Sequence, residues 1–116
     1  MSANAKSVSK VGELEEMVEL VHEAEGECNE IWLDYHDKRI SYKDAKERIE
    51  ELSIKAENAK STIIITSLED PDGGTNVAFL MYYLEIRDIT NYIKSLRDEI
   101  IEIAAERDEI RNAPKD

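Results

Sequence analysis

The longest regular pattern of hydrophobic residues lies in residues 79–110. Apolar side chains recur there at alternating spacings of three and four, which is the a/d pattern of a helix packed in a coiled coil. Nine of the ten a/d positions are apolar, and Arg107 is the exception. The ten are Phe79, Tyr82, Ile86, Ile89, Ile93, Leu96, Ile100, Ile103, Arg107 and Ile110. Isoleucine at both a and d favours three or more helices over two, so this helix is expected to pack against at least two partners.

Two further segments carry the same spacing and supply these partner helices. In the first, the a/d positions are Val11, Leu14, Val18, Val21, Glu25, Cys28, Trp32 and Tyr35, and the stripe is widened by Leu20, Ala24 and Ile31. In the second, they are Ala45, Ile49, Leu52, Ala56, Ala59, Ile63 and Thr66. The three patterns predict helices over about residues 8–39, 41–67 and 76–111.

Gly26 is the weakest point of the first predicted helix. A glycine in a helix interior costs about 1 kcal/mol relative to alanine. Gly26 also follows Glu25, which is the one charged residue at an a/d position of that helix. A kink or break near Gly26 is therefore an alternative to one continuous helix.

Two turn signals separate the predicted helices. Residues 37–40 place cations where a helix would end, and Ser41 and Asp44 then form a capping-box pattern with Asp in place of the usual Glu. Residues 69–76 contain Pro71 followed by paired glycines, which suit a reversal of the chain. Such short connections make neighbouring helices antiparallel.

One segment, Thr62–Thr66, fits two kinds of secondary structure. Its β-branched residues are typical of a strand, yet it continues the heptad phase and no second strand is evident for pairing. We therefore predict an all-α fold, an antiparallel up-down-up three-helix bundle with coiled-coil-like packing. The predicted single domain covers residues 8–112, between a disordered N-terminal tail at 1–7 and a C-terminal tail at 113–116.

Composition and charge narrow the classes of partner. Of the 116 residues, 41% are hydrophobic and 36% are charged, which suits long helices with charged outer faces. A net charge of −12 repels nucleic-acid phosphates and anionic membranes, so neither is an expected direct partner. No stretch reaches the roughly 18 uninterrupted apolar residues of a membrane span. Cys28 is the only cysteine, so no intrachain disulfide can form, and we expect a cytoplasmic protein with a buried, inert thiol.

The sharpest feature of the predicted surface is a row of carboxylates on the first helix, opposite its apolar stripe. This acidic stripe consists of Glu16, Glu19, Glu23, Glu27, Glu30, Asp34 and Asp37. Like charges one turn apart destabilise a helix by roughly 0.2–0.5 kcal/mol per pair. Two interpretations follow: a docking face for a basic protein partner, or a solvated face that only aids solubility.

A second surface feature is the uncharged stretch Val77–Leu84, which is apolar on all sides. One core-facing stripe requires only part of such a stretch, so other side chains need cover from elsewhere. Leu80, Met81 and Leu84 face away from the a/d positions of this helix. We expect them to form a contact between copies of the chain in a homo-oligomer.

Acids and histidines at helical spacing raise the alternative of a metal site. Glu19 and His22 have the Glu-x-x-His spacing of di-iron carboxylate bundles, which require a second such pair. The other histidine, His36, has Leu33 three residues before it, so that second pair is missing. No metal site and no cofactor is predicted on these grounds.

Two other groups of acids resemble a known enzyme class. Glu15-Glu16-Met-Val-Glu19 and Glu85-Ile-Arg-Asp88 resemble the two magnesium-binding motifs of the all-helical nucleotide pyrophosphohydrolases. This resemblance implies a small hydrolase that holds magnesium with Glu15, Glu16, Glu19 and Asp88. Motifs of this kind arise readily by chance in a chain with 27 acidic residues, so we do not assign the chain to that family.

We expect a non-catalytic protein–protein interaction module, an adaptor or assembly component that uses the acidic stripe and an apolar oligomer surface. The magnesium-dependent hydrolase is one alternative. The other is an inhibitor that mimics nucleic acid by presenting carboxylates in place of phosphates. Binding of Mg²⁺ would favour the enzyme, whereas salt-sensitive binding of a basic partner would favour the two interaction hypotheses.

Overall fold

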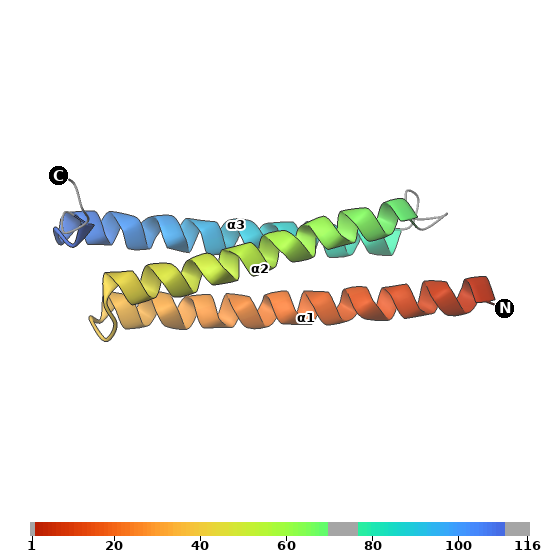
Figure 1. The fold of residues 1–116 in the computed structure, drawn as a ribbon, viewed down its shortest axis with the longest axis horizontal. Coiled ribbons are helices and arrows are strands. Elements are labelled where there is room, and N and C mark those ends of the chain that lie inside the picture. Colours follow the sequence, from red (N-terminus) through yellow and green to blue (C-terminus); the bar gives the residue numbers. More distant parts are fainter. Residues whose placement is uncertain (1, 70–76, 111–116) are drawn as a thin grey trace.

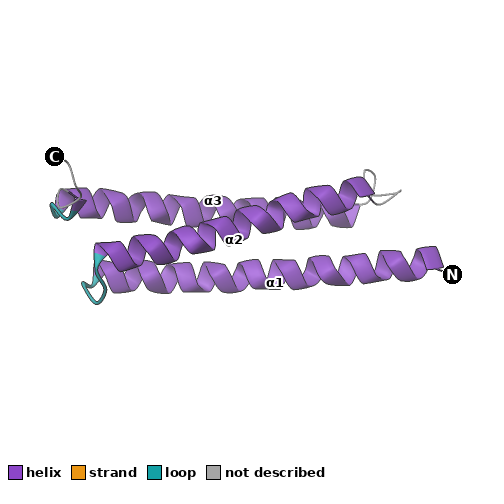
Figure 2. Cartoon of the chain, viewed as in Figure 1, coloured by secondary structure: helices purple, strands orange, loops and turns teal. Residues whose placement is uncertain are grey.

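The chain forms three long helices that all pack against one another, as predicted. The computed structural model describes residues 2–69 and 77–110, with α1 at Ser2–His36, α2 at Tyr42–Glu69 and α3 at Val77–Glu106. Figure 1 shows that α1 and α3 run in the same direction and α2 runs against both, which is the up-down-up arrangement. Figure 2 shows no strand among the described residues, and Thr62–Thr66 lies within α2. The all-α prediction is confirmed.

The core runs along the whole bundle, which measures 61 × 27 × 17 Å. The a/d positions predict it well, because a stripe at this spacing faces one side of a helix. On α3, the fully buried side chains at these positions are Ile86, Ile93 and Ile100. Ala45 and Ala56 on α2 are also fully buried, as expected for small residues that let neighbouring helices approach closely.

The first helix differs from the prediction in two respects. It begins at Ser2 rather than near residue 8, so residues 2–7, expected to be a disordered tail, are helical. It also continues through Gly26 without a break, and Figure 1 shows a single, nearly straight helix. The alternative of a break near Gly26 is therefore wrong. The buried neighbours Ala24 and Cys28 hold this part of α1 against the core, which outweighs the low helix propensity of one glycine.

Leu20 is a further correction to the sequence analysis. It was expected to widen the apolar stripe of α1, but it is 51% exposed. Ala24 and Ile31, the other two residues of that group, are buried. The stripe therefore widens only in the second half of the described helix.

Helix α3 ends at Glu106, five residues before the predicted end, because the chain turns at Asp108. Asp108 has a φ of 65°, and the amide of Glu109 donates to the carbonyl oxygen of Ala104 at 2.8 Å. This is the Schellman arrangement, which usually has glycine at the left-handed position. Helix α1 ends in the same way, with Lys38 at a φ of 65° and the amide of Arg39 donating to the carbonyl oxygen of Asp34 at 2.7 Å.

The turn between α1 and α2 follows the predicted capping pattern. The amide of Asp44 donates to the hydroxyl oxygen of Ser41 at 3.1 Å, so Ser41 caps the first turn of α2. The second predicted turn, at residues 69–76, lies almost entirely outside the described residues, as does the predicted C-terminal tail at 113–116.

Arg107, the one charged a/d position of the longest pattern, joins the ends of α1 and α3. Its guanidinium donates to the carbonyl oxygens of Tyr35 at 3.1 Å and His36 at 2.8 Å, and it lies 5.0 Å from the centre of the Tyr35 ring. The Tyr35 hydroxyl in turn donates to the carboxylate of Glu109. Arg107 thus adds a second donor to the Tyr35 carbonyl, which also accepts from the amide of Lys38 at 3.0 Å, and binds the carbonyl of His36 at the end of α1.

Candidate functional site

The acidic stripe lies on the outer face of α1, as the heptad pattern indicates. All of its members are exposed except Asp34, which is half-buried. Asp34 and Asp37 pair with Arg39, at 3.2 Å and 3.5 Å. No ion pair joins the other five to a described residue; these five are Glu16, Glu19, Glu23, Glu27 and Glu30.

The sequence places no lysine or arginine among these carboxylates. Residues 11–37 contain ten acidic residues and neither lysine nor arginine. Exposed acids on α3, such as Glu99 and Glu102, instead follow Lys94 and Arg97 on the same helix. Residues 11–36 of α1 therefore carry a long run of acids with neither lysine nor arginine between them.

Acids between the helices have partners of their own. Glu57 on α2 contacts Lys60 at 3.0 Å and also contacts Lys94 on α3. Hydrogen bonding from Lys94, followed by that from Lys60, lowers the pKa of Glu57. The pair between Glu57 and Lys94 joins α2 to α3, and none of these contacts involves the stripe.

The acids that the magnesium hypothesis requires are spread over two helices, and those with contacts have other partners. The Tyr82 hydroxyl donates to Glu15 at 3.3 Å, and Asp88 is paired with its neighbour Arg87 at 3.1 Å. No three acidic, histidine or cysteine side chains in the described part of the chain are placed to hold a metal ion together. The set Glu15, Glu16, Glu19 and Asp88 is therefore not assembled as a magnesium site.

His22, weighed above as a metal ligand, bridges two acids instead. It contacts Glu85 on α3 through Nε2, and its Nδ1 lies 3.5 Å from Glu25. Hydrogen bonding to Glu85 is the main cause that raises the pKa of His22, and Glu25 adds to it. Glu25, the charged a/d residue of α1, is half-buried. When His22 is protonated, Glu25 therefore has a cation beside it.

Cys28 is buried, as expected from its a/d position. Burial, with a further contribution from the nearby charge of Glu25, raises its pKa to about 12. The thiolate is the reactive form of cysteine, so this thiol is unreactive at neutral pH.

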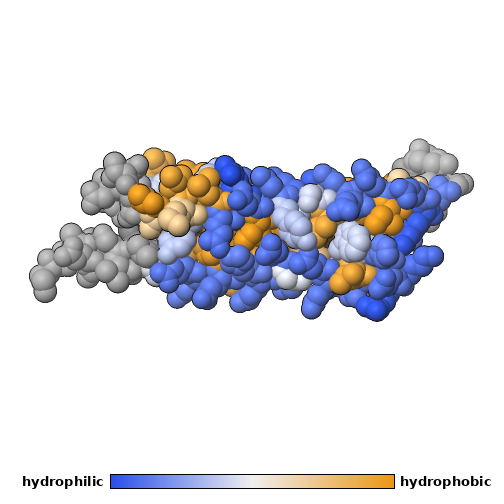
Figure 3. All heavy atoms as spheres, turned by 180° about the vertical axis from the view of Figure 1, so that it is seen from behind, coloured by the Kyte–Doolittle hydropathy of each residue, from blue (hydrophilic) through white to orange (hydrophobic). Residues whose placement is uncertain are grey.

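The predicted apolar surface is larger than the sequence analysis indicated. Leu80 and Met81 are 56% and 63% exposed, whereas Leu84 is half-buried. Large exposed side chains also occur nearby on α3 and on the end of α2. Together with Leu80 and Met81 they form what we call the apolar patch: Ile64, Ile65, Leu68, Val77, Leu80 and Met81. Figure 3 shows the bundle from behind. On the face that it displays, apolar side chains gather at one end, while polar side chains cover most of the rest.

The α2 members of the patch were not predicted from the sequence, for a specific reason. The heptad pattern predicts only which residues face the core. It assigns Ile63 and Thr66 to the core side of the helix and predicts nothing about the apolar residues beside them. These are Ile64, Ile65 and Leu68. A usable signal was present, because residues 61–68 contain no charged side chain in a chain that is 36% charged.

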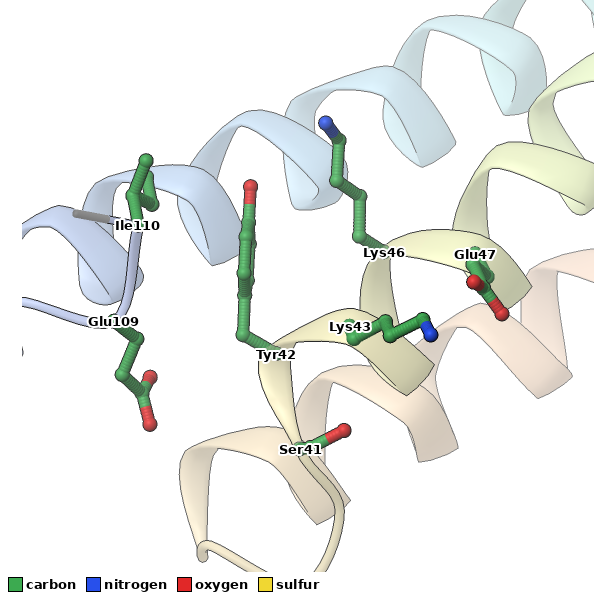
Figure 4. A pocket seen from close by; sticks show the side chains of 7 residues that line it. All are labelled: Ser41, Tyr42, Lys43, Lys46, Glu47, Glu109 and Ile110. Carbon is green, nitrogen blue, oxygen red and sulfur yellow. The ribbon is translucent and has the colours of Figure 1, made fainter. Parts of the chain in front are cut away.

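A pocket of about 580 Å³ lies at the opposite end of the bundle. Its lining residues come from the start of α2 and from the segment that follows α3: Ser41, Tyr42, Lys43, Lys46, Glu47, Glu109 and Ile110. In Figure 4 the Tyr42 ring lies between Ile110 and Lys46. Tyr42 and Ile110 also pack against the core, so the pocket wall helps to close this end of the bundle.

A smaller pocket of about 330 Å³ lies between α1 and α3, where Trp32 and Tyr92 form part of the lining. Trp32 stacks on His36 at a ring distance of 4.9 Å, and the Tyr92 hydroxyl donates to Asn29. The indole Nε1 of Trp32 is buried and has no hydrogen-bond partner among the described residues.

Comparisons with known proteins add no assignment: no family model, no curated protein and no solved structure matches this chain. Among the described residues, no helix combines the length and the apolar character needed to cross a membrane.

Proposed function

We propose that the protein is a non-catalytic interaction module, an adaptor or assembly component that binds a basic protein partner through the acidic stripe of α1. The observation that supports this proposal best is the row of five exposed glutamates that pair with no cation among the described side chains. They lie on a helix that has no lysine or arginine from residue 11 to residue 37. The single buried thiol, Cys28, is compatible with a reducing compartment, and the proposal keeps the cytoplasm as the setting.

The pattern of charges favours docking over solubility alone. Solubility requires net charge, and mixed lysine and glutamate at helical spacing would supply it without repulsion along the helix. The stripe instead concentrates one sign on one face, which raises the association rate of a partner of opposite charge. Each exposed carboxylate can also accept a hydrogen bond from lysine or arginine.

The proposal includes self-association through the apolar surface that contains Leu80, Met81 and Leu84. The exposure of Leu80 and Met81 supports it, because large apolar side chains in a contiguous area mark interaction sites in soluble proteins. Neither part of the proposal requires a cofactor or a metal ion.

A charge-reversal experiment tests the stripe. The test variant carries Glu16→Lys, Glu23→Lys and Glu30→Lys, and the probe is a lysine-rich peptide labelled with a fluorophore. A matched control carries Glu99→Lys, Glu102→Lys and Glu106→Lys, which change the net charge equally on exposed positions of α3. We expect the wild type to bind the peptide less tightly as salt rises. We expect the α1 variant to lose binding and the α3 variant to retain most of it.

Thermal melts of the same proteins separate binding from stability. The α1 variant should be at least as stable as the wild type, since attractive pairs replace repulsive ones at a few tenths of a kcal/mol each. Equal loss of binding in both variants would show that net charge alone attracts the peptide. The stripe would then be a solvated face.

A further inference from the structure

The apolar patch lies at the end of the bundle where α2 ends and α3 begins. Its six side chains are 42–80% exposed, with Ile64 the least and Leu68 the most exposed. The segments that carry it, residues 61–68 and 77–84, contain no charged residue. The patch is therefore an uncharged area on a chain of net charge −12, and the described acids that flank it in the sequence are Glu69 and Glu85.

The size of the patch is the first reason to expect that another molecule covers it. Six large aliphatic side chains exposed to this extent present on the order of 600 Å², which matches the largest apolar patches on monomeric proteins. A standard interface buries about 800 Å² on each partner. The patch and a polar rim around it are thus enough for a specific dimer of modest affinity.

The charge of the chain is the second reason, and it indicates which molecule binds. A basic partner would find no carboxylate among residues 61–68 or 77–84 to pair with its cations. Two copies of this acidic chain repel each other over most of their surfaces, but the patch lets them touch without placing like charges face to face. An uncharged apolar surface is also complementary to itself, as a two-fold symmetric contact requires.

We propose that two copies of the chain associate through this patch, with the α2–α3 ends of both copies forming a four-helix contact. This inference rests on the self-association part of the proposed function and names its surface, its symmetry and the α2 residues that belong to it.

The arrangement leaves the acidic stripe free. The patch belongs to α2 and α3, whereas the stripe lies on the outer face of α1, so dimerisation covers none of its members. Each dimer presents two acidic stripes to a partner. A basic partner with two binding segments would then gain avidity without any new contact.

A matched pair of single substitutions in the full chain tests the dimer. Met81→Glu places a carboxylate in the patch at a position that is 63% exposed, and Ile54→Glu does the same on α2 outside the patch at a position that is 60% exposed. Both positions are exposed, so both variants should keep the helical content and melting behaviour of dilute wild type. Sedimentation equilibrium over a series of protein concentrations then measures the dimer dissociation constant.

We expect the wild type and Ile54→Glu to dimerise with similar constants. Met81→Glu should weaken the dimer at least about tenfold, because each interface would then hold two opposed carboxylates. Salt should strengthen the wild-type dimer by screening the repulsion between the two acidic chains, whereas it should weaken peptide binding to the stripe. Because salt has opposite effects on dimerisation and on peptide binding, the experiment can disprove either interaction without disproving the other.

Three results would overturn the inference. One is a wild type that remains monomeric at high protein concentration and high salt. Another is a dimer that Met81→Glu and Ile54→Glu affect equally. The third is a monomer whose patch binds vesicles of neutral phosphatidylcholine, which would make a lipid surface the occupant in place of a second copy.

Discussion

The two ends of the bundle differ in the side chains that they carry and in the contacts that these side chains make. At the end where α1 and α3 finish, Tyr35, Arg107 and Glu109 form hydrogen bonds and a ring contact between the two helices. At the end where α2 finishes and α3 begins, six large apolar side chains are exposed, and Leu68 is the most exposed of them at 80%. We call the first the polar end and the second the apolar end.

This difference separates side chains that stabilise the single chain from side chains that do not. At the polar end, the side chain of Arg107, just after α3, binds the carbonyl oxygens of the last two residues of α1, so the residues there are explained by stability. At the apolar end, exposed aliphatic side chains give the isolated chain no comparable benefit, since apolar surface stabilises a structure only when it is removed from water. The apolar end is thus where a partner is to be sought.

The largest expected effect comes from breaking the core that both ends share. Ile93 is fully buried near the middle of α3, and Ile93→Asp would place a carboxylate there without a partner. The cost of several kcal/mol is comparable with the total stability of a small domain, so we expect an unfolded or loosely packed chain. Circular dichroism during urea titration measures this. Asn91→Asp adds the same charge at an exposed position and should retain the wild-type transition.

Much of this fold could be predicted from the sequence, because the heptad pattern depends on the property that determines burial in a helical bundle. Ile86, Ile93 and Ile100 were assigned to the core by spacing alone, and all three are fully buried. The rule fails where the chain leaves the helix. Asp108 adopts a left-handed conformation that usually signals glycine, so nothing in the pattern marked the end of α3 before it.

The interaction surfaces were predicted less completely, for a related reason. The acidic stripe was found because charge recurs at helical spacing on α1. The α2 half of the apolar patch was missed because Ile64, Ile65 and Leu68 lie beside a/d positions in an apolar run. Only the packing of α2 against α3 shows which residues of such a run remain exposed. The hydrogen bond and ring contact between Arg107 and Tyr35 were not predicted either, although Arg107 was the one charged a/d position of the third helix pattern.

The next effect in size concerns the polar end alone. Arg107→Met keeps much of the side-chain length but removes the hydrogen bonds to the carbonyl oxygens of Tyr35 and His36 and the charge over the Tyr35 ring. We expect a loss of about 1–3 kcal/mol in the free energy of unfolding, measured by urea denaturation.

The control for this prediction lies nearer the apolar end of the same helix. Arg87 is exposed and pairs only with its neighbour Asp88 among the described residues, at 3.1 Å. Arg87→Met should change the free energy of unfolding by less than about 0.5 kcal/mol, as is usual for exposed ion pairs. If both substitutions had equal effects, Arg107 would be an ordinary surface residue and the contrast between the ends would disappear.

The smallest effect concerns two tyrosine–glutamate hydrogen bonds, one toward each end. Tyr35 is 1% exposed and donates to Glu109, whereas Tyr82 is partly exposed and donates to Glu15 at 3.3 Å. Tyr35→Phe should lower the free energy of unfolding by about 1 kcal/mol at neutral pH, and Tyr82→Phe by less than about 0.5 kcal/mol. Urea titrations of both variants beside the wild type measure the two differences.

Raising the pH provides a second measurement of the same contrast. Burial, followed by the hydrogen bond to Glu109, raises the pKa of Tyr35 from its ordinary 10.0 to about 12. Because the folded-state pKa lies above the unfolded value, the stabilisation from Tyr35 is complete below about pH 10 and is lost as the pH rises toward about 12. The stability difference between wild type and Tyr35→Phe should therefore shrink over this range. Burial also raises the pKa of Tyr82, so the matched Tyr82→Phe series shows how much of the change belongs to Tyr35. A difference for Tyr35→Phe that stays constant from neutral pH to about pH 12 would mean that folding does not raise the pKa of Tyr35, and hence that its hydroxyl is not buried as described.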